Sequence, residues 1–419
     1  MNKTPKLRFK EFSGDWEIKK LGELGEFKKT YSFSRSLEGE GNYKHIHYGD
    51  IHMNYKGIIS KDKLIPSIDI PSDDNYEFIQ DRDIIFADAS EDRKDLGKVA
   101  VVRNIEGNIL SGLHTLCFRP KEDLNSEFFL SHSLNKEYLK FMYTRGNGAK
   151  VLGISKSNLS EYKFLAPSKE EQEKIASFFS LIDDKISLQG EKVEALKDYK
   201  KGMMQKIFSR ELRFKDDEGR DYPEWEEKKL GDIGIFKTSS VDKLINENEE
   251  LVYLVNYMDV YKHIDINKDS IMNLMKVSAK DAQIENNNLI KGDILFTPSS
   301  ETPDDIGHSI VIFEDLPKTL YSYHLVRFRP EIKLNLLYSH YFCNIDSVRS
   351  QIVKFATGST RFTVSINEFS KVKVNIPSYN EQKKIGEFLN NIDLKLRKEQ
   401  EKLDYLNEYK KGLLQQMFV

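Results

Sequence analysis

Two segments of the chain, Pro167 to Phe208 and Pro377 to Phe418, carry apolar residues at alternating steps of four and three. This spacing puts the apolar side chains on one stripe of a helix and is typical of a coiled-coil seam. Each segment therefore predicts one long amphipathic helix, with Ser168 or Ser378 as its N-cap. The predicted seam positions are Ile175, Phe179, Ile182, Ile186, Val193, Leu196, Met203 and Ile207 in the first segment and Ile385, Leu389, Ile392, Leu396, Leu403, Leu406, Leu413 and Met417 in the second, with Gln189 and Glu399 at the skipped layers.

The two segments are copies of each other. They align without a gap at an offset of 210 residues, and 19 of the 42 aligned positions are identical. Trp16 and Trp225, the only tryptophans, each begin the pattern W-x3-K-L-G-x2-G and are expected to be packing anchors. A duplication of this kind predicts two equivalent halves, each with its own core. We expect four parts, which are residues 1–166, 167–210, 211–376 and 377–419, the second and fourth being the long helices.

Each half has mixed secondary structure outside the long helices. The offset of 210 also relates Asp83 to Asp293 and His114 to His324. Short apolar runs rich in β-branched residues predict strands, and apolar spacing of three and four predicts helices, so the fold class is α+β. The predicted strands are Ile84–Ala87, Val99–Val102, Ile294–Phe296 and Ile310–Phe313, and the predicted helices are Ser126–Tyr143 and Leu336–Phe355.

The order of the parts along the chain predicts the direction of the two long helices. The first helix leaves the first half and leads into the second half, and the second helix is the last element. Two such helices run antiparallel when they pack together, and both chain termini then lie beside the first half. The predicted fold is two tandem α+β domains joined by two long antiparallel coiled-coil helices, an internal repeat with pseudo-twofold symmetry.

Composition narrows the class of protein. The 419 residues include 64 Lys and Arg and 67 Asp and Glu, so the net charge of −3 disfavours non-specific coating of nucleic acid. Cys117 and Cys343 lack the spacing of a disulfide framework or a zinc site. No apolar run approaches 18 residues, and residues 1–12 have no apolar signal core. We expect a cytoplasmic protein without a membrane partner.

Catalytic signatures are scarce. The chain has no GxxxxGKS/T, GxGxxG, HExxH or GxSxG pattern. Asp304 with Glu331 and Lys333 is compatible with a metal-dependent nuclease, but the first half lacks this pattern, and it arises easily because 31% of the residues are charged. His114 and His324 have no second ligand nearby in the sequence, which favours hydrogen-bonded structural histidines. We therefore expect no catalytic residue, no metal and no cofactor.

Two glycine loops, residues 145–150 and 356–361, carry the best candidates for nucleic-acid binding. Their glycines let backbone N–H groups approach a phosphate, and a serine follows each loop, at Ser155 and Ser365. The stretches 140–165 and 347–374 each have five basic residues and one acid, a net charge of +4. A solvated charged face is the alternative interpretation. The DNA-binding candidates are Arg145, Asn147, Lys150, Lys156, Arg349, Lys354, Ser359 and Arg361.

Four features occur twice and in the same order: W-x3-K-L-G-x2-G, the glycine loop, P-x3-E-Q-x-K-I and YKKG-x2-Q. Together they resemble the specificity subunit of a type I restriction-modification enzyme, and the resemblance covers the whole chain. It implies two target-recognition domains that each read one half of a bipartite target in double-stranded DNA. It also implies that the long helices set the spacing and dock two methyltransferase subunits.

The resemblance further implies that the chain is not an enzyme, because partner subunits would carry S-adenosylmethionine-dependent methylation and restriction/translocase subunits would carry ATP-dependent cleavage. Two other classes stay open at this point. A coiled-coil scaffold or adaptor would join two proteins without reading DNA, and a nuclease would use Asp304, Glu331 and Lys333. The variable parts of the two halves match no known target, so the half-sequences and the gap between them do not follow from the sequence.

Overall fold

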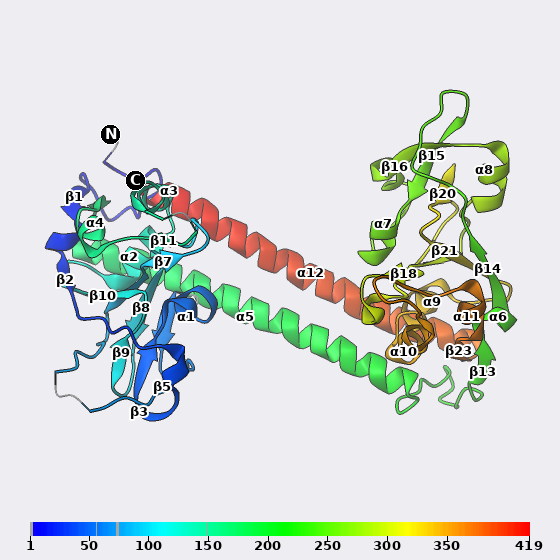
Figure 1. Ribbon diagram of the computed structural model, residues 1–419, viewed down its shortest axis with the longest axis horizontal. Helices are drawn as coiled ribbons and strands as arrows, with labels where there is room; N and C mark the ends of the chain where they lie inside the picture. Colours follow the sequence, from blue (N-terminus) through cyan, green and yellow to red (C-terminus); the bar gives the residue numbers. More distant parts are fainter. Residues whose placement is uncertain (1–2, 56, 73–74, 149) are drawn as a thin grey trace. The chain divides into compact units, whose positions relative to one another are not determined.

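The computed structural model describes residues 3–55, 57–72, 75–148 and 150–419. It divides into two compact units, Met1–Glu191 with Gln400–Val419 (unit 1) and Lys192–Glu399 (unit 2). Figure 1 shows the order of the elements in each unit, and each of the two long helices contributes to both units.

The two long helices predicted from the seam pattern are present. Helix α5 spans Lys169–Phe208 and helix α12 spans Tyr379–Met417. In each unit the two helices run antiparallel, since residues later in α5 pair with residues earlier in α12. The pairs that show this are Asp183–Lys410 (2.5 Å) and Phe179–Phe418 (6.0 Å between ring centroids) in unit 1, and Lys192–Glu399 and Lys200–Asp393 (2.6 Å each) in unit 2.

The predicted seam is the buried stripe of α5. Ile175, Phe179, Val193 and Ile207 are almost fully buried, whereas Gln189 is a polar residue that is only 6% exposed. A polar side chain inside an apolar seam specifies register, because any shift would bury it against unsuitable neighbours. The polar layer expected from the sequence is therefore part of the seam.

The repeated Pro-Ser-x-x-Glu-Gln sequence fixes the first turn of each long helix. In unit 1 the Ser168 hydroxyl accepts a hydrogen bond from the Glu171 N–H at 3.4 Å, so Ser168 caps the helix as predicted. The Gln172 side chain donates to the Asp123 carbonyl at 3.1 Å and accepts from the Asn125 N–H at 3.0 Å. The glutamine thus ties the start of α5 to the loop at residues 123–125.

The glutamate of the same sequence forms a buried ion pair with an arginine near the beginning of each half. Glu171 accepts from two nitrogens of Arg8 at 2.8 and 2.7 Å. Glu381 accepts from Arg213 at 3.2 and 3.0 Å, and also from the indole N–H of Trp225 at 3.0 Å. Sequence reasoning missed both pairs, although Leu-Arg-Phe precedes each half at a comparable place.

Unit 1 has mixed α and β structure, as predicted. Its strands are β1 (Glu17–Lys20), β2 (Gly25–Phe27), β3 (Glu38–Ile46), β4 (Ile58–Ser60), β5 (Ser67–Ile68), β6 (Ile84–Ala87), β7 (Ala89–Ser90), β8 (Val99–Arg103), β9 (Ile109–Ser111), β10 (Thr115–Pro120), β11 (Leu152–Gly153) and β12 (Lys163–Ala166). Its other helices are η1 (Leu21–Glu23), η2 (Arg35–Leu37), α1 (Tyr48–Met53), α2 (Ser126–His132), α3 (Lys136–Arg145) and α4 (Lys156–Ser160).

The central sheet of unit 1 has the strand order β2-β10-β6-β8-β4, and both of its faces are buried. Successive residues of a strand point to opposite faces, so Ile84 and Phe86 enter one core while Ile85 and Ala87 enter the other. Helices α2 and α3 and the long helices pack on the first face, and the sheet β5-β3-β9 lies on the second. Burial on both faces explains why β6 and β8 are continuous apolar runs rather than alternating ones.

Unit 2 repeats this arrangement. Its strands are β13 (Glu226–Lys229), β14 (Gly234–Thr238), β15 (Glu250–Val255), β16 (Met275–Ala279), β17 (Ile294–Phe296), β18 (Ser299–Ser300), β19 (Ser309–Val311), β20 (Thr319–Tyr321), β21 (Val326–Pro330), β22 (Phe362–Thr363) and β23 (Lys373–Ile376). Its other helices are α6 (Leu230–Ile233), α7 (Tyr257–Tyr261), η3 (Ile271–Asn273), α8 (Asp281–Asn287), η4 (Pro303–Asp305), α9 (Leu336–Phe342), α10 (Asp346–Phe355) and α11 (Ile366–Lys371).

The sheets of unit 2 correspond to those of unit 1. The order β14-β21-β17-β19 matches β2-β10-β6-β8, and the parallel pair β15-β20 matches β3-β9. Three predicted strands agree with β6, β8 and β17 to within one residue, and the fourth, 310–313, overlaps β19 but begins and ends later. The predicted α+β repeat is confirmed.

One expectation about helices was wrong, because each predicted short helix is two helices. Residues 126–143 form α2 and most of α3, and residues 336–355 form α9 and α10. In unit 1 the break occurs where the Asn135 side chain accepts from the Tyr138 N–H at 2.9 Å and caps a new helix. Apolar spacing continues across the break, so the hydrophobic pattern alone does not detect it.

Both chain ends lie in unit 1, as the order of the parts predicts. The Leu7 N–H donates to the Gln416 carbonyl at 2.9 Å. Trp16 is 2% exposed and meets Phe418 edge-on, with 6.3 Å between ring centroids. Trp225 is likewise buried in unit 2. The tryptophans are confirmed as packing anchors, and the one in unit 1 holds the end of the chain.

Candidate nucleic-acid interface

The glycine loop of unit 1 is a closed turn between α3 and β11. Asn147 and Gly153 exchange two backbone hydrogen bonds of 3.0 and 2.8 Å across the turn. Gly148 has a φ of +138°, and a Cβ atom there would lie 1.9 Å from the Val151 carbonyl oxygen. Only glycine fits this position, since the space is filled by backbone and the φ disfavours any side chain. Ala149 lies outside the described residues.

The glycine loop of unit 2 closes in the same way between α10 and β22. Thr357 and Thr363 exchange backbone hydrogen bonds of 2.9 Å each. Gly358 has a φ of +139°, and a Cβ atom there would lie 2.0 Å from the Arg361 carbonyl oxygen. Two halves with little sequence identity in these loops have therefore kept one backbone geometry.

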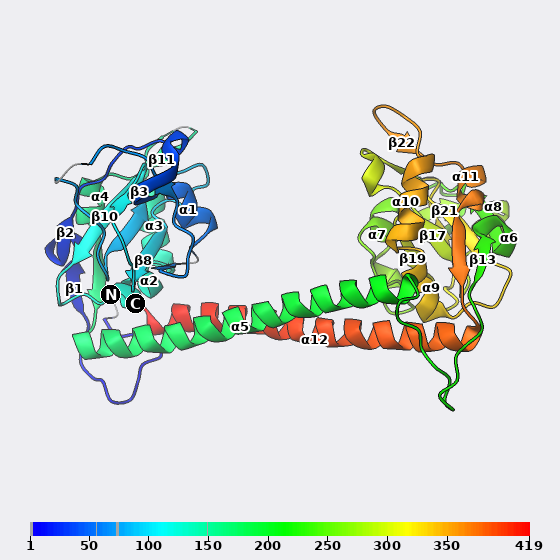
Figure 2. The same ribbon diagram turned by 90° about the horizontal axis from the view of Figure 1, so that it is seen from below.

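Each glycine loop is held against the strand that follows the central β6 or β17. Strand β11 pairs with β7, and β22 pairs with β18. The predicted serines cap the next short helix: Ser155 accepts from the Asn158 N–H at 3.2 Å, and Ser365 from the Glu368 N–H at 3.4 Å. In Figure 2 both β11 and β22 lie at the end of their own unit that is remote from the long helices.

Most of the predicted DNA-binding side chains are exposed on or beside these loops. In unit 1 the four candidates are exposed, and Arg145 is the last residue of α3 with its guanidinium 5.9 Å from the Phe141 ring centroid. In unit 2 three of the four are exposed. The exposed candidates are Arg145, Asn147, Lys150, Lys156, Lys354, Ser359 and Arg361.

Arg349 differs from the other candidates because its own unit binds its guanidinium. Its Nη2 donates to the Asp304 carbonyl at 3.0 Å and lies 3.3 Å from Nε2 of His308. The side chain is half-buried at the junction of α10 and η4. This arrangement favours a structural role over a phosphate contact.

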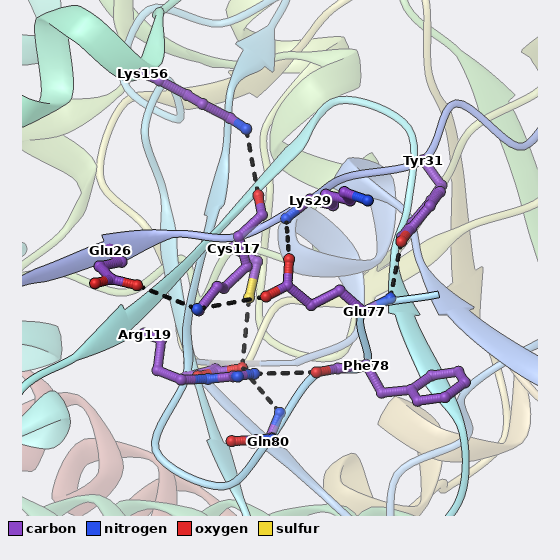
Figure 3. Close-up of polar contacts among 11 residues, drawn as sticks. Glu26, Lys29, Tyr31, Glu77, Phe78, Gln80, Cys117, Arg119 and Lys156 are labelled. Carbon is purple, nitrogen blue, oxygen red and sulfur yellow. Dashed lines mark hydrogen bonds and ion pairs between the residues drawn. The ribbon is translucent and has the colours of Figure 1, made fainter. Parts of the chain in front are cut away.

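Lys156 connects the loop region of unit 1 to the edge strand β2. Its ammonium group donates to the Lys28 carbonyl at 3.2 Å, and the ammonium of Lys28 lies 3.4 Å from Glu77 (Figure 3). The Lys29 N–H donates to Glu77 at 2.9 Å and lowers the pKa of that carboxyl, an effect to which Lys28 adds. The Lys156 side chain is thus exposed, and its hydrogen bond to the Lys28 carbonyl holds its ammonium group in place.

A buried aspartate–arginine pair lies at the start of β6 in unit 1 and of β17 in unit 2, and both pairs were missed from the sequence. Asp83 accepts from Arg119 at 2.9 and 2.8 Å, and Asp293 accepts from Arg329 at 2.7 and 2.8 Å. Both aspartates are fully buried. Cys117 lies 3.5 Å from Asp83, and burial raises the pKa of this thiol. The sequence contains a signal for these pairs, because the aspartate and the arginine of unit 1 both recur 210 positions later.

The residues of the nuclease alternative pack on different elements. Asp304 lies in η4 beside α10, whereas the Lys333 ammonium lies 4.2 Å from the ring centroid of Tyr379 at the start of α12. Among the described residues, no group of three or more His, Cys, Asp and Glu side chains is arranged to hold a metal ion. In the same described part of the chain, no helix has the length and apolar character needed to cross a membrane.

Residues 13–198 and 222–408 match the family model of the type I restriction modification DNA specificity domain. The chain belongs to this family, and one match falls in each half of the sequence. Membership in a DNA specificity family does not favour a coiled-coil scaffold that does not read DNA.

Two similar proteins come from Methanocaldococcus jannaschii. The putative type I restriction enzyme MjaX specificity subunit is 28% identical over 243 residues, and the match covers 55% of this chain and 56% of that relative. The chain therefore spans about half the length of that relative. The type I restriction enzyme MjaVIII specificity subunit is 23% identical over 424 residues, with 94% and 92% covered.

Two solved structures share the fold. The type I restriction-modification S subunit from M. genitalium has a TM-score of 0.57 and 17% identity, with 99% of both chains covered. A structure described as the basis of complex assembly and conformational transition of the type I R-M system has a TM-score of 0.58 and 15% identity, with 95% of this chain and 96% of that one covered. At these identities the likeness concerns the fold.

Proposed function

We propose that this protein is the DNA sequence-recognition subunit of a type I restriction-modification complex. Residues 1–166 and 211–376 are its two target-recognition domains, and each reads one half of a bipartite target in double-stranded DNA. The observation that carries the proposal is the pair of glycine loops, which share one closed geometry and present exposed cations in both units. Identical geometry with little sequence identity suits contacts to phosphates, which are the same in every sequence.

Lys150 and Arg361 are the phosphate contacts that we propose. Each lies in a glycine loop and is exposed, and Arg361 also reaches Ser299 on β18 at 3.4 Å. Replacing either with alanine is expected to weaken binding by the complex on all sequences and to reduce the salt slope by roughly one unit. Lys19→Ala on β1 is the control. A variant that changes the preferred sequence and keeps the slope contradicts the assignment.

The long helices offer a second repeated surface, which we propose as the docking site for two methyltransferase subunits. A pocket of about 500 Å³ in unit 1 and one of about 630 Å³ in unit 2 lie between the end of a long helix and a corner of two short helices. Three residues that line the pocket of unit 2 have an identical counterpart, 210 positions later, that lines the pocket of unit 1. The pairs are Lys201/Lys411, Gln205/Gln415 and Phe208/Phe418.

The lining combines aromatic or aliphatic surface with lysines, so it fits a partner segment with an apolar side chain next to acidic ones. One pocket in each unit fits two copies of one partner. Methylation then belongs to the methyltransferase subunits, and ATP-dependent cleavage belongs to restriction/translocase subunits. This chain supplies no catalytic residue.

Charge reversal tests the docking surface. Lys411→Glu and Lys201→Glu are each expected to remove one methyltransferase subunit from the complex, and the double variant both, as measured by native mass spectrometry. Lys185→Glu, an exposed lysine of α5 outside the pockets, is the matched control. If both single variants retain two subunits, the pockets are not the docking sites.

A further inference from the structure

Asp88 occupies the junction between the glycine loop of unit 1 and the tip before β10. Its N–H donates to the His114 carbonyl at 3.1 Å, and its carbonyl accepts from the Ile154 N–H, just after β11, at 2.8 Å. Its carboxylate oxygen lies 3.3 Å from Nδ1 of His114. The main-chain hydrogen bonds and the side-chain contact together hold Asp88 and His114 next to each other beside the glycine loop.

The His114 ring is held in place and yet accessible. Its side chain is 50% exposed and that of Asp88 is 25% exposed. His114 has a φ of +55°, a left-handed conformation that residues other than glycine adopt infrequently and that clusters at functional sites. Tyr48 meets the imidazole edge-on with 5.4 Å between centroids. The fold therefore keeps His114 in an unfavourable backbone conformation, and its imidazole is exposed while Asp88 and Tyr48 hold it in place.

A carboxylate on this surface needs an explanation, because phosphates would repel it. Burial raises the pKa of Asp88, and the nearby His114 opposes that effect. The Asp88 carboxylate lies beside Nδ1 of His114, which holds it in place. An ionised carboxylate can only accept hydrogen bonds. In the major groove, amino donors occur on cytosine N4 and adenine N6.

Unit 2 differs at the equivalent place. The residue 210 positions after Asp88 is Pro298, which has no carboxylate. His324, the counterpart of His114, contacts Tyr323, with 3.9 Å between ring centroids and an angle of 37° between the ring planes. Two half-sites of different sequence require base-reading residues that differ between the units, whereas phosphate contacts can be repeated.

We propose that Asp88, oriented by His114, accepts a hydrogen bond from the exocyclic amino group of a cytosine or adenine in the half-site read by unit 1. This inference rests on the proposed function, because it requires that the glycine-loop surface faces DNA. Asp88 is then a specificity-determining residue, and His114 is its positioning residue.

The first test maps methylated sites produced by the complex in cells with the wild-type chain, Asp88→Asn or Asp88→Ala. Both variants are expected to lose the preference for one base in one half-site and to keep the other half-site and the gap. Glu122→Gln, an exposed acid in the turn before α2, is the matched control. If the wild-type chain yields no bipartite site, the proposed function fails; if it does and the variants yield the same site, only this inference fails.

The second test measures binding of the purified complex to duplexes in which the mapped base lacks its amino group, 2-pyrimidinone for cytosine or purine for adenine. The wild-type complex is expected to lose about tenfold to a hundredfold in affinity with one of the two analogues, and the Asp88→Ala complex to show no further loss. The analogue that acts identifies the base. Equal losses on all sequences, or loss of the folded state in both variants, would overturn the inference in favour of a structural role.

Discussion

Replacing Glu381 with alanine is expected to destabilise unit 2 by about 4 kcal/mol. The carboxylate is fully buried, and it accepts from the Arg213 guanidinium and from the Trp225 indole. Breaking a buried ion pair costs roughly 3–5 kcal/mol, and we take about 3 because Arg213 is 20% exposed. Loss of the neutral indole bond adds about 1 kcal/mol. Glu171 bonds Arg8 in the same way, and the Trp16 indole N–H has no partner among the described residues, so Glu171→Ala should cost about 3 kcal/mol.

The two tryptophans provide the assay, because each belongs to one unit. In a Trp16→Phe background, urea unfolding followed by Trp225 fluorescence reports on unit 2, and the reverse background reports on unit 1. With a urea dependence of about 2 kcal/mol per molar for a unit of this size, 4 kcal/mol corresponds to a midpoint lowered by about 2 M.

Glu387→Ala is the control for this measurement, since Glu387 is an exposed residue of the same helix. Its midpoint should change by less than about 0.3 M, because surface ion pairs contribute little. A shift below about 0.5 M for Glu381→Ala would refute the role of the buried pair. Equal shifts for Glu381→Ala and Glu171→Ala would refute the contribution of the Trp225 indole.

Three further predictions follow from other parts of the molecule. Burial lowers the pKa of His132 from 6.5 to about 3, so between these pH values the unfolded chain binds a proton that the folded chain does not. The free energy of unfolding of unit 1 therefore falls by about 1.4 kcal/mol per pH unit as the pH falls. His132→Gln should remove this pH dependence, as measured by urea midpoints at pH 6.5 and 4.5. Gly358→Ala should open its glycine loop and lower DNA affinity about tenfold, because the strained backbone costs roughly 1–3 kcal/mol; Gly412→Ala, with nothing within 4 Å of the new Cβ, should leave affinity unchanged. Matched insertions of four residues after Leu188 and Lys398 lengthen the helix pair by about 6 Å and should widen the gap between half-sites by one or two base pairs; methylated-site mapping that shows altered half-sequences would contradict this.

The hydrophobic pattern predicted the long helices, their seam and the central strands, because these features depend on which side chains are buried. It missed the break after α2, since Asn135 ends one helix and caps the next by hydrogen bonds that leave the apolar spacing intact. Glycine content located both loops. The closure of each loop by paired backbone hydrogen bonds was not predictable, because such bonds join main-chain groups whatever the side chains are.

Comparison of the two halves identifies residues that hold the fold. The identical pairs Glu171/Glu381 and Asp83/Asp293 are buried and make the same internal contacts in both units. Identity of buried residues at the offset of 210 therefore marks packing, whereas the exposed identical pairs Lys201/Lys411 and Gln205/Gln415 line the pockets proposed for partner docking.

Residues at equivalent places beside the glycine loops differ between the units. Asp88 corresponds to Pro298, and Lys156 corresponds to Ile366, although the backbone around each pair is the same. A surface that keeps its backbone and changes its side chains is what a protein needs to read two different half-sequences with one fold. We propose that the contrast between matched interior pairs and unmatched pairs beside the glycine loops marks the target-reading face, and Asp88 is the position at which this proposal is tested most sharply.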